Sequence, residues 1–263
     1  LEQKLSEYSI PSKEYIKIPL EQAELNGYIM RPSDFNPDKK YPTLFYVYGG
    51  PGSQTVTKSF SSGQRAMWHK YLAEQGYIVV SVDNRGTGAR GRNFEKQIYK
   101  KLGQYEVVDQ IDAAKYLTKT YDFIDEDRLG IWGWSYGGYM SSLVLAQGND
   151  LFDTAIAVAP VTNWRFYDTI YTERFMQTPQ MNPEGYKKGS PITYADQIEG
   201  NYLLVHGTGD DNVHFQNSVE LVNELVAESV QFESMYYPNR SHDIYGGNAR
   251  NHLYKMMNNF ILE

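Results

Sequence analysis

The sequence GWSYGG at residues 133–138 joins a predicted strand, residues 128–132, to a predicted helix that begins near Tyr139. Its glycines stand two positions on either side of Ser135, where a side chain would collide with the crossing strand and helix. In such a turn the serine has a strained backbone and points its hydroxyl outward. The first N–H groups of the helix face the same point. The stretch therefore predicts an exposed, reactive serine between a strand and a helix.

A Gly-x-Ser-x-Gly motif alone also fits an ordinary glycine-rich turn with a solvated serine. The residues downstream favour a catalytic interpretation, because two aspartates at 210–211 and then His242 follow Ser135 along the chain. Enzymes that place a nucleophilic serine on a strand-to-helix turn carry their partners in the order serine, acid, histidine. We therefore interpret Ser135 as the nucleophile of an acyl-transfer reaction.

The bulk composition suits one large α/β domain and excludes several kinds of partner and site. The 263 residues carry a formal charge of -7, and no basic stripe interrupts that average. Such a surface repels phosphate backbones, so we expect no nucleic-acid partner. The chain has no cysteine, which excludes a disulfide framework, a thiolate metal site and a cysteine nucleophile.

Targeting and membrane signals are weak throughout the sequence. The longest apolar runs, such as residues 78–82 and 155–160, are too short to span a bilayer, and no signal peptide opens the chain. We therefore expect no membrane contact by this segment. The chain begins at Leu1 without a methionine, and we expect it to be a processed or excised part of a longer protein.

Apolar runs of strand length alternate with amphipathic segments of helix length. This predicts an α/β fold in one domain over residues 1–263, with a mostly parallel central sheet and helices on both faces. Ligands then bind at the carboxyl ends of the strands. The predicted strands are residues 15–18 and 27–30, an antiparallel lead-in, and then 43–48, 77–83, 128–132, 154–158, 202–205 and 232–237. The predicted helices are residues 64–75, 103–120, 139–147 and 215–228, and a last helix from Ala249.

Two polar features receive structural interpretations. The glycines of residues 86–91 match a dinucleotide-binding fingerprint, but no second strand ending in an acidic residue follows about 20 positions later. We interpret them as a turn in which Arg85 pairs with a neighbouring carboxylate. In the predicted helix at residues 103–120, Glu106 and Asp109 lie outside the apolar face.

Five histidines are candidates for the general base. We expect His69 and His252 on polar helix faces, His206 as a structural residue at a strand end, and His214 at the entrance to a helix. His242 lies in a polar loop after the last predicted strand, where the chain order requires the base. An imidazole there can take a proton and return it at neutral pH.

The acid should follow a strand between the serine and the histidine, so that it orients the imidazole. Asp210 and Asp211 both meet this condition, and spacing alone leaves the choice open. Asp243 adjoins the histidine and faces its own backbone, so we discount it.

The motifs in this order resemble the catalytic domain of the prolyl oligopeptidase family, most closely its dipeptidyl peptidase IV branch, over nearly the whole chain. The resemblance implies the α/β-hydrolase fold. It rests on YVYGGPGS at residues 46–53, GWSYGG at 133–138, WRFYD at 164–168 with YTER at 171–174, and HGTGDDNVH at 206–214.

By this resemblance the catalytic triad is Ser135, Asp210 and His242, which chooses between the two aspartates. The oxyanion donors fall on the Tyr48 hydroxyl and the backbone N–H of Tyr136. A phenol at the end of a buried strand beside a glycine-rich loop is a competent donor for this role.

The resemblance also assigns the residues that bind substrate. Asn212 matches a residue that binds the carbonyl just before the scissile residue. A pocket lined by rings suits proline, which buries apolar area and has no N–H to leave unsatisfied. The implied pocket for the residue at the scissile bond is formed by Tyr136, Val161, Trp164, Tyr167, Tyr171 and Val213.

The resemblance implies a serine exopeptidase that releases N-terminal dipeptides with proline or alanine in the penultimate position. The family's amine-binding glutamates lie on an N-terminal β-propeller, and residues 1–25 would be the connection from it. The alternatives are a prolyl tripeptidyl peptidase or another oligopeptidase of the family and, more distantly, a carboxylesterase or a non-catalytic binding protein. Peptide substrates, no cofactor or metal, a homodimer through this domain and an extracytoplasmic location complete the expectation.

Overall fold

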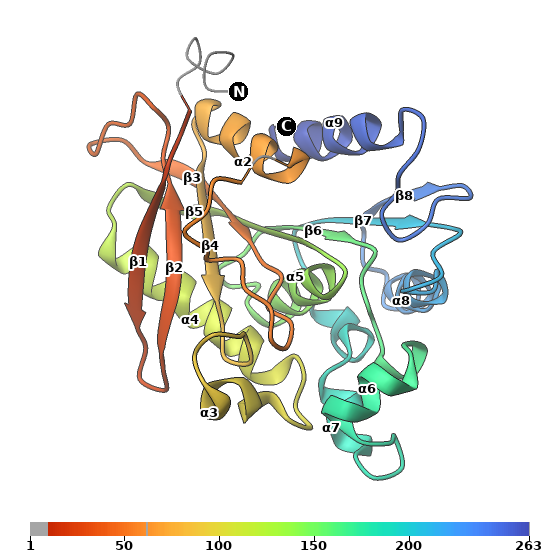
Figure 1. The fold of residues 1–263 in the computed structure, drawn as a ribbon. Coiled ribbons are helices and arrows are strands. Elements are labelled where there is room, and N and C mark those ends of the chain that lie inside the picture. The colour runs from red at the N-terminus through yellow and green to blue at the C-terminus, as the bar shows by residue number, and fades with distance from the viewer. Residues whose placement is uncertain (1–9, 62, 263) are drawn as a thin grey trace.

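One eight-stranded sheet forms the centre of the computed structural model, which describes residues 10–61 and 63–262 (Figure 1). Its strands are β1 (Lys13–Pro19), β2 (Glu24–Met30), β3 (Tyr41–Tyr46), β4 (Ile78–Asp83), β5 (Ile124–Trp134), β6 (Thr154–Val158), β7 (Asn201–Gly207) and β8 (Glu233–Tyr237). They lie in the order β1-β2-β4-β3-β5-β6-β7-β8. The pairs β1·β2 and β2·β4 are antiparallel, and all pairs from β4 to β8 are parallel. The predicted α/β fold with an antiparallel lead-in is confirmed.

Helices cover both faces of the sheet. The α-helices are α2 (Gln64–Glu74), α3 (Arg92–Glu95), α4 (Gln104–Thr120), α5 (Tyr136–Gln147), α6 (Thr169–Met176), α7 (Pro183–Lys188), α8 (Gln216–Ala227) and α9 (Ala249–Leu262). In Figure 1, α2 and α9 lie above the sheet, and α4, α5 and α8 lie below it. Each side has its own buried cluster of apolar side chains. The sheet is therefore the middle of three layers.

The central strands are apolar on both faces because both faces are covered. All six residues of β4 are buried, and its sequence IVVSVD is mainly apolar without alternation, as in a parallel core strand. The carboxyl ends of the parallel strands meet at one edge of the sheet, where the loops after β3, β5, β7 and β8 gather. This edge holds the residues that the sequence singles out.

Two predicted boundaries were wrong in ways that affect the site. Helix α5 begins at Tyr136, directly after Ser135, and not near Tyr139. Gly137 and Gly138 therefore belong to its first turn, where the helix lies against neighbouring backbone. Strand β3 ends at Tyr46, so Tyr48 lies two residues beyond the strand, in the glycine-rich loop.

Helix α4 corrects the interpretation of its polar residues. Glu106 and Asp109 are buried, although the sequence placed them outside the apolar face. Asp109 forms a buried ion pair with Arg85, with 2.7 Å between Oδ1 and Nη2, which confirms the predicted role of Arg85. Buried carboxylates need such partners.

The segment before β1 remains partly outside the structure. The proposed connection at residues 1–25 falls on residues 1–9, which lie outside the described residues, and on β1 and the start of β2. Its link to a preceding domain stays a prediction.

Candidate active site

Ser135 stands on the sharp turn between β5 and α5. Its backbone has φ 61° and ψ -118°, which for a residue with a side chain is a strained conformation. The turn is held by its own hydrogen bonds, since the Ser135 N–H donates to Val158 O at 2.8 Å and its carbonyl accepts from Tyr139 N at 3.0 Å. The predicted strained strand-to-helix turn is thus present.

The flanking glycines are required by close backbone contacts. A Cβ on Gly133 would overlap the backbone of Gly137, and a Cβ on Gly137 would overlap the carbonyl oxygen of Val47. The strand and the helix can cross at this distance only without those side chains. The glycine pattern therefore sets where Ser135 lies relative to the end of β3.

His242 and Asp210 lie against each other in the loops that follow β8 and β7. His242 Nδ1 is 2.7 Å from Asp210 Oδ2. Because a carboxylate only accepts, Nδ1 carries the proton and Nε2 of a neutral His242 is left as an acceptor. This is the tautomer that a general base needs.

The loop that carries His242 is tied to the Ser135 turn through the neighbouring tryptophan. Trp134 Nε1 donates to the carbonyl oxygen of His242 at 3.0 Å. Trp134, the residue before Ser135, therefore helps to hold the loop of His242 close to the end of β5.

Asp210 is buried and held by several donors. Its Oδ1 accepts from the backbone N–H groups of Asn212 at 3.0 Å and Val213 at 2.9 Å. Burial disfavours the charged carboxylate, but the hydrogen bonds from His206 and His242 outweigh it. The pKa of Asp210 therefore lies well below its usual range. By contrast, Asp211 is exposed, so the structure brings the first of the two aspartates to His242.

His206 has a function that the sequence did not reveal. Its Nε2 lies 3.1 Å from Asp210 Oδ2 and 2.8 Å from Val213 O, and its Nδ1 lies 2.7 Å from Ser218 Oγ. Both partners of Nε2 are acceptors, so Nε2–H donates and Nδ1 of the neutral ring accepts from Ser218. His206, at the end of β7, therefore orients the carboxylate of Asp210 through this hydrogen bond and acts as a structural residue.

The two candidate oxyanion donors lie side by side. The rings of Tyr48 and Tyr136 have centroids 6.1 Å apart, and the backbone of Gly50 lies against both. Burial raises the pKa of Tyr48, so its hydroxyl stays protonated and can donate. No described residue accepts a hydrogen bond from it. The Tyr136 N–H belongs to the first turn of α5, where backbone donors have no helical partner.

Beside the turn, the segment after β6 builds a cluster of rings. Trp164 is 1% exposed and stacks on Tyr171 with 5.9 Å between centroids, while Tyr167 meets both rings edge-on. The Tyr167 hydroxyl donates to Asn212 Oδ1 at 2.7 Å, which joins this cluster to the loop of Asp210. Tyr136 packs on the same tryptophan, and Val161 and Val213 are buried nearby in the same core.

Glu106 lies beneath the ring cluster and was missed as a site residue. The Tyr136 hydroxyl donates to its Oε1 at 2.8 Å. Glu106 is fully buried, and burial raises its pKa to about 7, although hydrogen bonds from backbone N–H groups and from Tyr136 act in the opposite direction. The residue pattern at the start of α4 carries no local signal for this burial.

The described residues contain no group of three or more histidine, aspartate or glutamate side chains that could hold a metal ion. None of the helices in the described ranges is both long enough and apolar enough to cross a bilayer.

With this geometry in place, comparison with known proteins identifies the family. A sequence profile described as the prolyl oligopeptidase family matches residues 64–263. The chain belongs to this family. The crystal structure of Porphyromonas gingivalis dipeptidyl peptidase 4 superposes with a TM-score of 0.94 at 46% identity, covering 99% of this chain and 36% of that one.

Curated relatives agree with this assignment. The chain is 47% identical over 260 residues to a probable dipeptidyl-aminopeptidase B of Coccidioides posadasii, covering 97% of this chain and 28% of the relative. It is 44% identical over 265 residues to human prolyl endopeptidase FAP, covering 99% of this chain and 34% of that relative. The chain thus spans about a third or less of the length of these relatives.

Proposed function

We propose that this chain is the catalytic domain of a serine exopeptidase that releases N-terminal dipeptides with proline or alanine in the penultimate position. The observation that carries the proposal is the 2.7 Å contact of Asp210 with His242 beside the strained turn of Ser135. The relatives named dipeptidyl-aminopeptidase B and dipeptidyl peptidase 4 support the dipeptidyl specificity.

The proposed chemistry proceeds through an acyl-enzyme. Ser135 Oγ forms a bond to the scissile carbonyl carbon while its proton passes to His242 Nε2. The tetrahedral intermediate then breaks its C–N bond, and the same proton goes to the leaving amine. Water attacks the resulting ester, gives a proton to His242, and the dipeptide leaves as that proton returns to Ser135.

Charge forms at two places in these steps, and each has a group to stabilise it. The ionised Asp210 stabilises the imidazolium that forms on His242, and it keeps the ring in the required tautomer. The Tyr48 hydroxyl and the Tyr136 N–H are the donors for the oxyanion. The hydrogen bonds from these donors stabilise the transition state most, because the negative charge on the oxygen has developed there.

Specificity comes from the rings beside the serine. Tyr167 and Tyr171, packed on the buried Trp164, offer flat apolar surfaces for a proline side chain. Proline suits such a pocket because it brings no N–H that would need a partner there. Asn212 is exposed at the edge of the cluster and is the proposed partner of the preceding carbonyl.

The test uses the full-length protein that carries this chain. Chromogenic X-Pro, X-X-Pro and N-blocked X-Pro substrates are compared, and a phosphonofluoridate probe is located by mass spectrometry with Ser135→Ala as the control. Cleavage of X-Pro with a free amine and labelling of Ser135 alone support the proposal. Preference for X-X-Pro would indicate a tripeptidyl peptidase, cleavage of the blocked substrate an endopeptidase, and turnover of esters alone a carboxylesterase.

Two further properties are proposed from the family resemblance. These are a homodimer through this domain and an extracytoplasmic location of the full-length protein. Sedimentation of the full-length protein and fractionation of its source cells would test them separately.

A further inference from the structure

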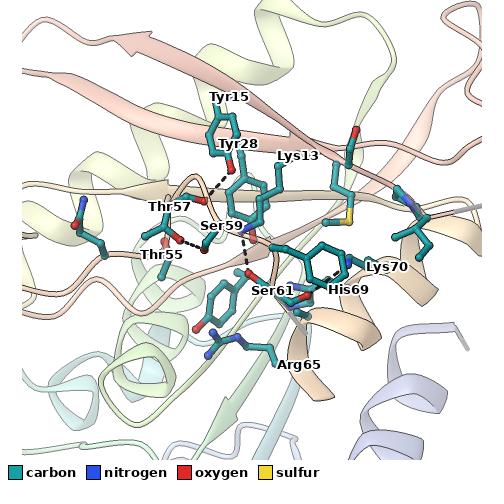
Figure 2. Close-up of a pocket in the computed structure, with 18 residues that line it drawn as sticks. Lys13, Tyr15, Tyr28, Thr55, Thr57, Ser59, Ser61, Arg65, His69 and Lys70 are labelled. Atoms are coloured by element: carbon teal, nitrogen blue, oxygen red, sulfur yellow. Dashed lines mark hydrogen bonds between the residues drawn. The ribbon is translucent and has the colours of Figure 1, made fainter. Parts of the chain in front are cut away.

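A cavity separate from the candidate active site lies between the antiparallel lead-in and α2. It is bounded by β1, the ends of β2 and β3, the loop after β3, and the first turns of α2 (Figure 2). Its volume is about 390 Å³, within the range of about 300–1,000 Å³ found for small-molecule sites. None of its lining residues belongs to the candidate catalytic or substrate-binding set. We call it the α2 cavity.

The charges of the α2 cavity are all of one sign. Lys13 from β1 and Arg65 and Lys70 from α2 line it, and no aspartate or glutamate does so among the described residues. Within the described ranges, none of the three cations forms an ion pair. In a chain with a formal charge of -7, such a concentration of positive charge is local and marked.

The two lysines are held in place by weak neutral partners. Lys13 Nζ donates to Ser61 Oγ at 3.3 Å and Lys70 Nζ donates to Ser61 O at 3.4 Å, as the dashed lines in Figure 2 show. Burial lowers the pKa of Lys13, and the charges of Arg65 and Lys70 lower it further. The ammonium groups therefore repel one another, and a bound anion would reduce this repulsion.

The carboxylate that holds the loop after β3 does not face the cavity. Asp83 at the end of β4 accepts from the N–H and the hydroxyl of Thr55 at 2.8 and 2.7 Å, and from Val56 N at 3.1 Å. Its oxygens face this loop and are not part of the cavity wall. Asp83 therefore stabilises the loop and leaves the lysines without a counter-ion.

A buried histidine adds a neutral donor to the cavity wall. His69 is only 3% exposed, so the predicted polar helix face was wrong for this residue. Trp132 Nε1 donates to His69 Nε2 at 3.1 Å, and a nitrogen that accepts carries no hydrogen. The proton of the neutral ring must then lie on Nδ1, which has no hydrogen-bond partner among the described residues.

The protonation state of His69 is fixed by its surroundings. Burial lowers its pKa to about 3, and the positive charges of Arg65 and Lys13 act in the same direction. The ring is neutral at physiological pH and presents one N–H. His69 lines the cavity, so water or a ligand there can accept from this N–H.

The rest of the wall is partly apolar or aromatic and partly neutral and polar, the polar part coming from Ser12, Gln54, Thr55, Thr57, Ser59 and Ser61. Met30, Tyr28 and Phe60 line the cavity. Lys13 Nζ lies 4.8 Å from the centroid of the Tyr28 ring, and Lys70 Nζ lies 4.0 Å from that of Phe60. A ligand with an anionic acceptor and an apolar body can contact both the cations and the rings of this wall.

We propose that the α2 cavity binds a small organic carboxylate that carries an apolar or aromatic group. The carboxylate accepts from Lys13, Lys70 and the Nδ1–H of His69, and the apolar group packs on the rings of Tyr28 and Phe60. The site is independent of Ser135, so it does not depend on the proposed peptidase activity.

The experiment measures ligand binding to the full-length protein by calorimetry. The probes are phenylacetate, its neutral isostere phenylacetamide, and inorganic phosphate, which has the charge without the apolar body. Phenylacetate should bind, phenylacetamide should bind at least about tenfold more weakly, and phosphate should also be weaker, since charge-assisted hydrogen bonds and apolar contact contribute together.

Variants locate the binding. Lys13→Gln and Lys70→Gln should each weaken the binding of phenylacetate by about tenfold or more. Lys119→Gln, which removes an exposed positive charge from the end of α4, should leave the affinity unchanged. Melting temperature and turnover on an X-Pro substrate report folding, because neither lysine lies in the candidate active site.

The alternative outcomes each contradict the proposal. If wild type binds none of the probes, the cations are ordinary solvated charges. If phenylacetate binds equally to both lysine variants, it binds elsewhere. Equal affinity for phenylacetamide would mean an apolar pocket without charge recognition, and tighter binding of phosphate would mean an inorganic anion site.

Discussion

Tyr136 donates its phenolic hydrogen to Glu106 at 2.8 Å, and both side chains are buried. The backbone N–H of the same tyrosine is a proposed oxyanion donor. The carboxyl of α4 therefore positions a residue that contributes to two parts of the site. Its protonation has consequences for stability that can be measured.

The first prediction concerns the pH dependence of folding. The pKa of Glu106 rises from 4.5 to about 7 on folding, so the folded state holds a proton that the unfolded state loses above pH 4.5. Relative to Glu106→Gln, the free energy of unfolding of the wild type should therefore fall by about 3 kcal/mol between pH 4.5 and pH 7. Urea denaturation at several pH values measures this difference.

The matched control for this pH dependence of unfolding is Glu228→Gln, which removes an exposed carboxylate at the end of α8. Its difference from wild type should show no comparable trend with pH. A constant difference for Glu106→Gln across the same range would contradict the burial argument.

The second prediction concerns the proposed acid. Asp210→Asn removes the charge that stabilises the His242 imidazolium and reverses the tautomer preference, so turnover should fall by about 10⁴. Asp211→Asn, at an exposed position, should lose far less. Steady-state kinetics on an X-Pro substrate compares the two variants. Equal losses, or the opposite ranking, would remove Asp210 from its proposed role.

The third prediction concerns Tyr48. Tyr48→Phe keeps the ring and removes only the hydroxyl, so turnover should fall by about 10²–10³ with little change in KM. Tyr99→Phe, at a surface position, serves as the control. A Tyr48→Phe protein that melts normally and retains full turnover would leave the oxyanion to backbone donors such as the N–H of Tyr136.

The fourth prediction concerns His69. Because its pKa falls to about 3, the ring should remain neutral from pH 8 down to pH 4, with the proton on Nδ1. Nitrogen-15 NMR of histidine-labelled protein distinguishes the two tautomers and the cation. Titration near pH 6.5, or a proton on Nε2, would contradict the hydrogen bond from Trp132.

Local patterns were enough to predict the framework of the site. The apolar runs of the parallel strands and the glycines around Ser135 encode the sheet edge and the turn within a few neighbouring residues. The spacing argument left Asp210 and Asp211 equivalent, because their difference depends on which one reaches His242 across two loops. The family resemblance made that choice, and the structure places the same residue against the histidine.

The buried polar groups could not be predicted in the same way. Glu106 and His69 each lie on a helix where a polar residue normally faces solvent. Their burial comes from Tyr136 and Trp132, which approach from distant parts of the chain. A single sequence carries no local signal for such contacts.

The order of the strands also bears on how the edges of this sheet interact with other molecules. β1 and β8 are the outermost strands, and an outer strand can recruit a further strand from another molecule. Charged residues along β1, including Lys17 and Glu14, and the five-residue length of β8 oppose that pairing. Strand β1 therefore has two roles: Lys13 contributes to the wall of the α2 cavity, and the charges of Glu14 and Lys17 protect the sheet edge against aggregation.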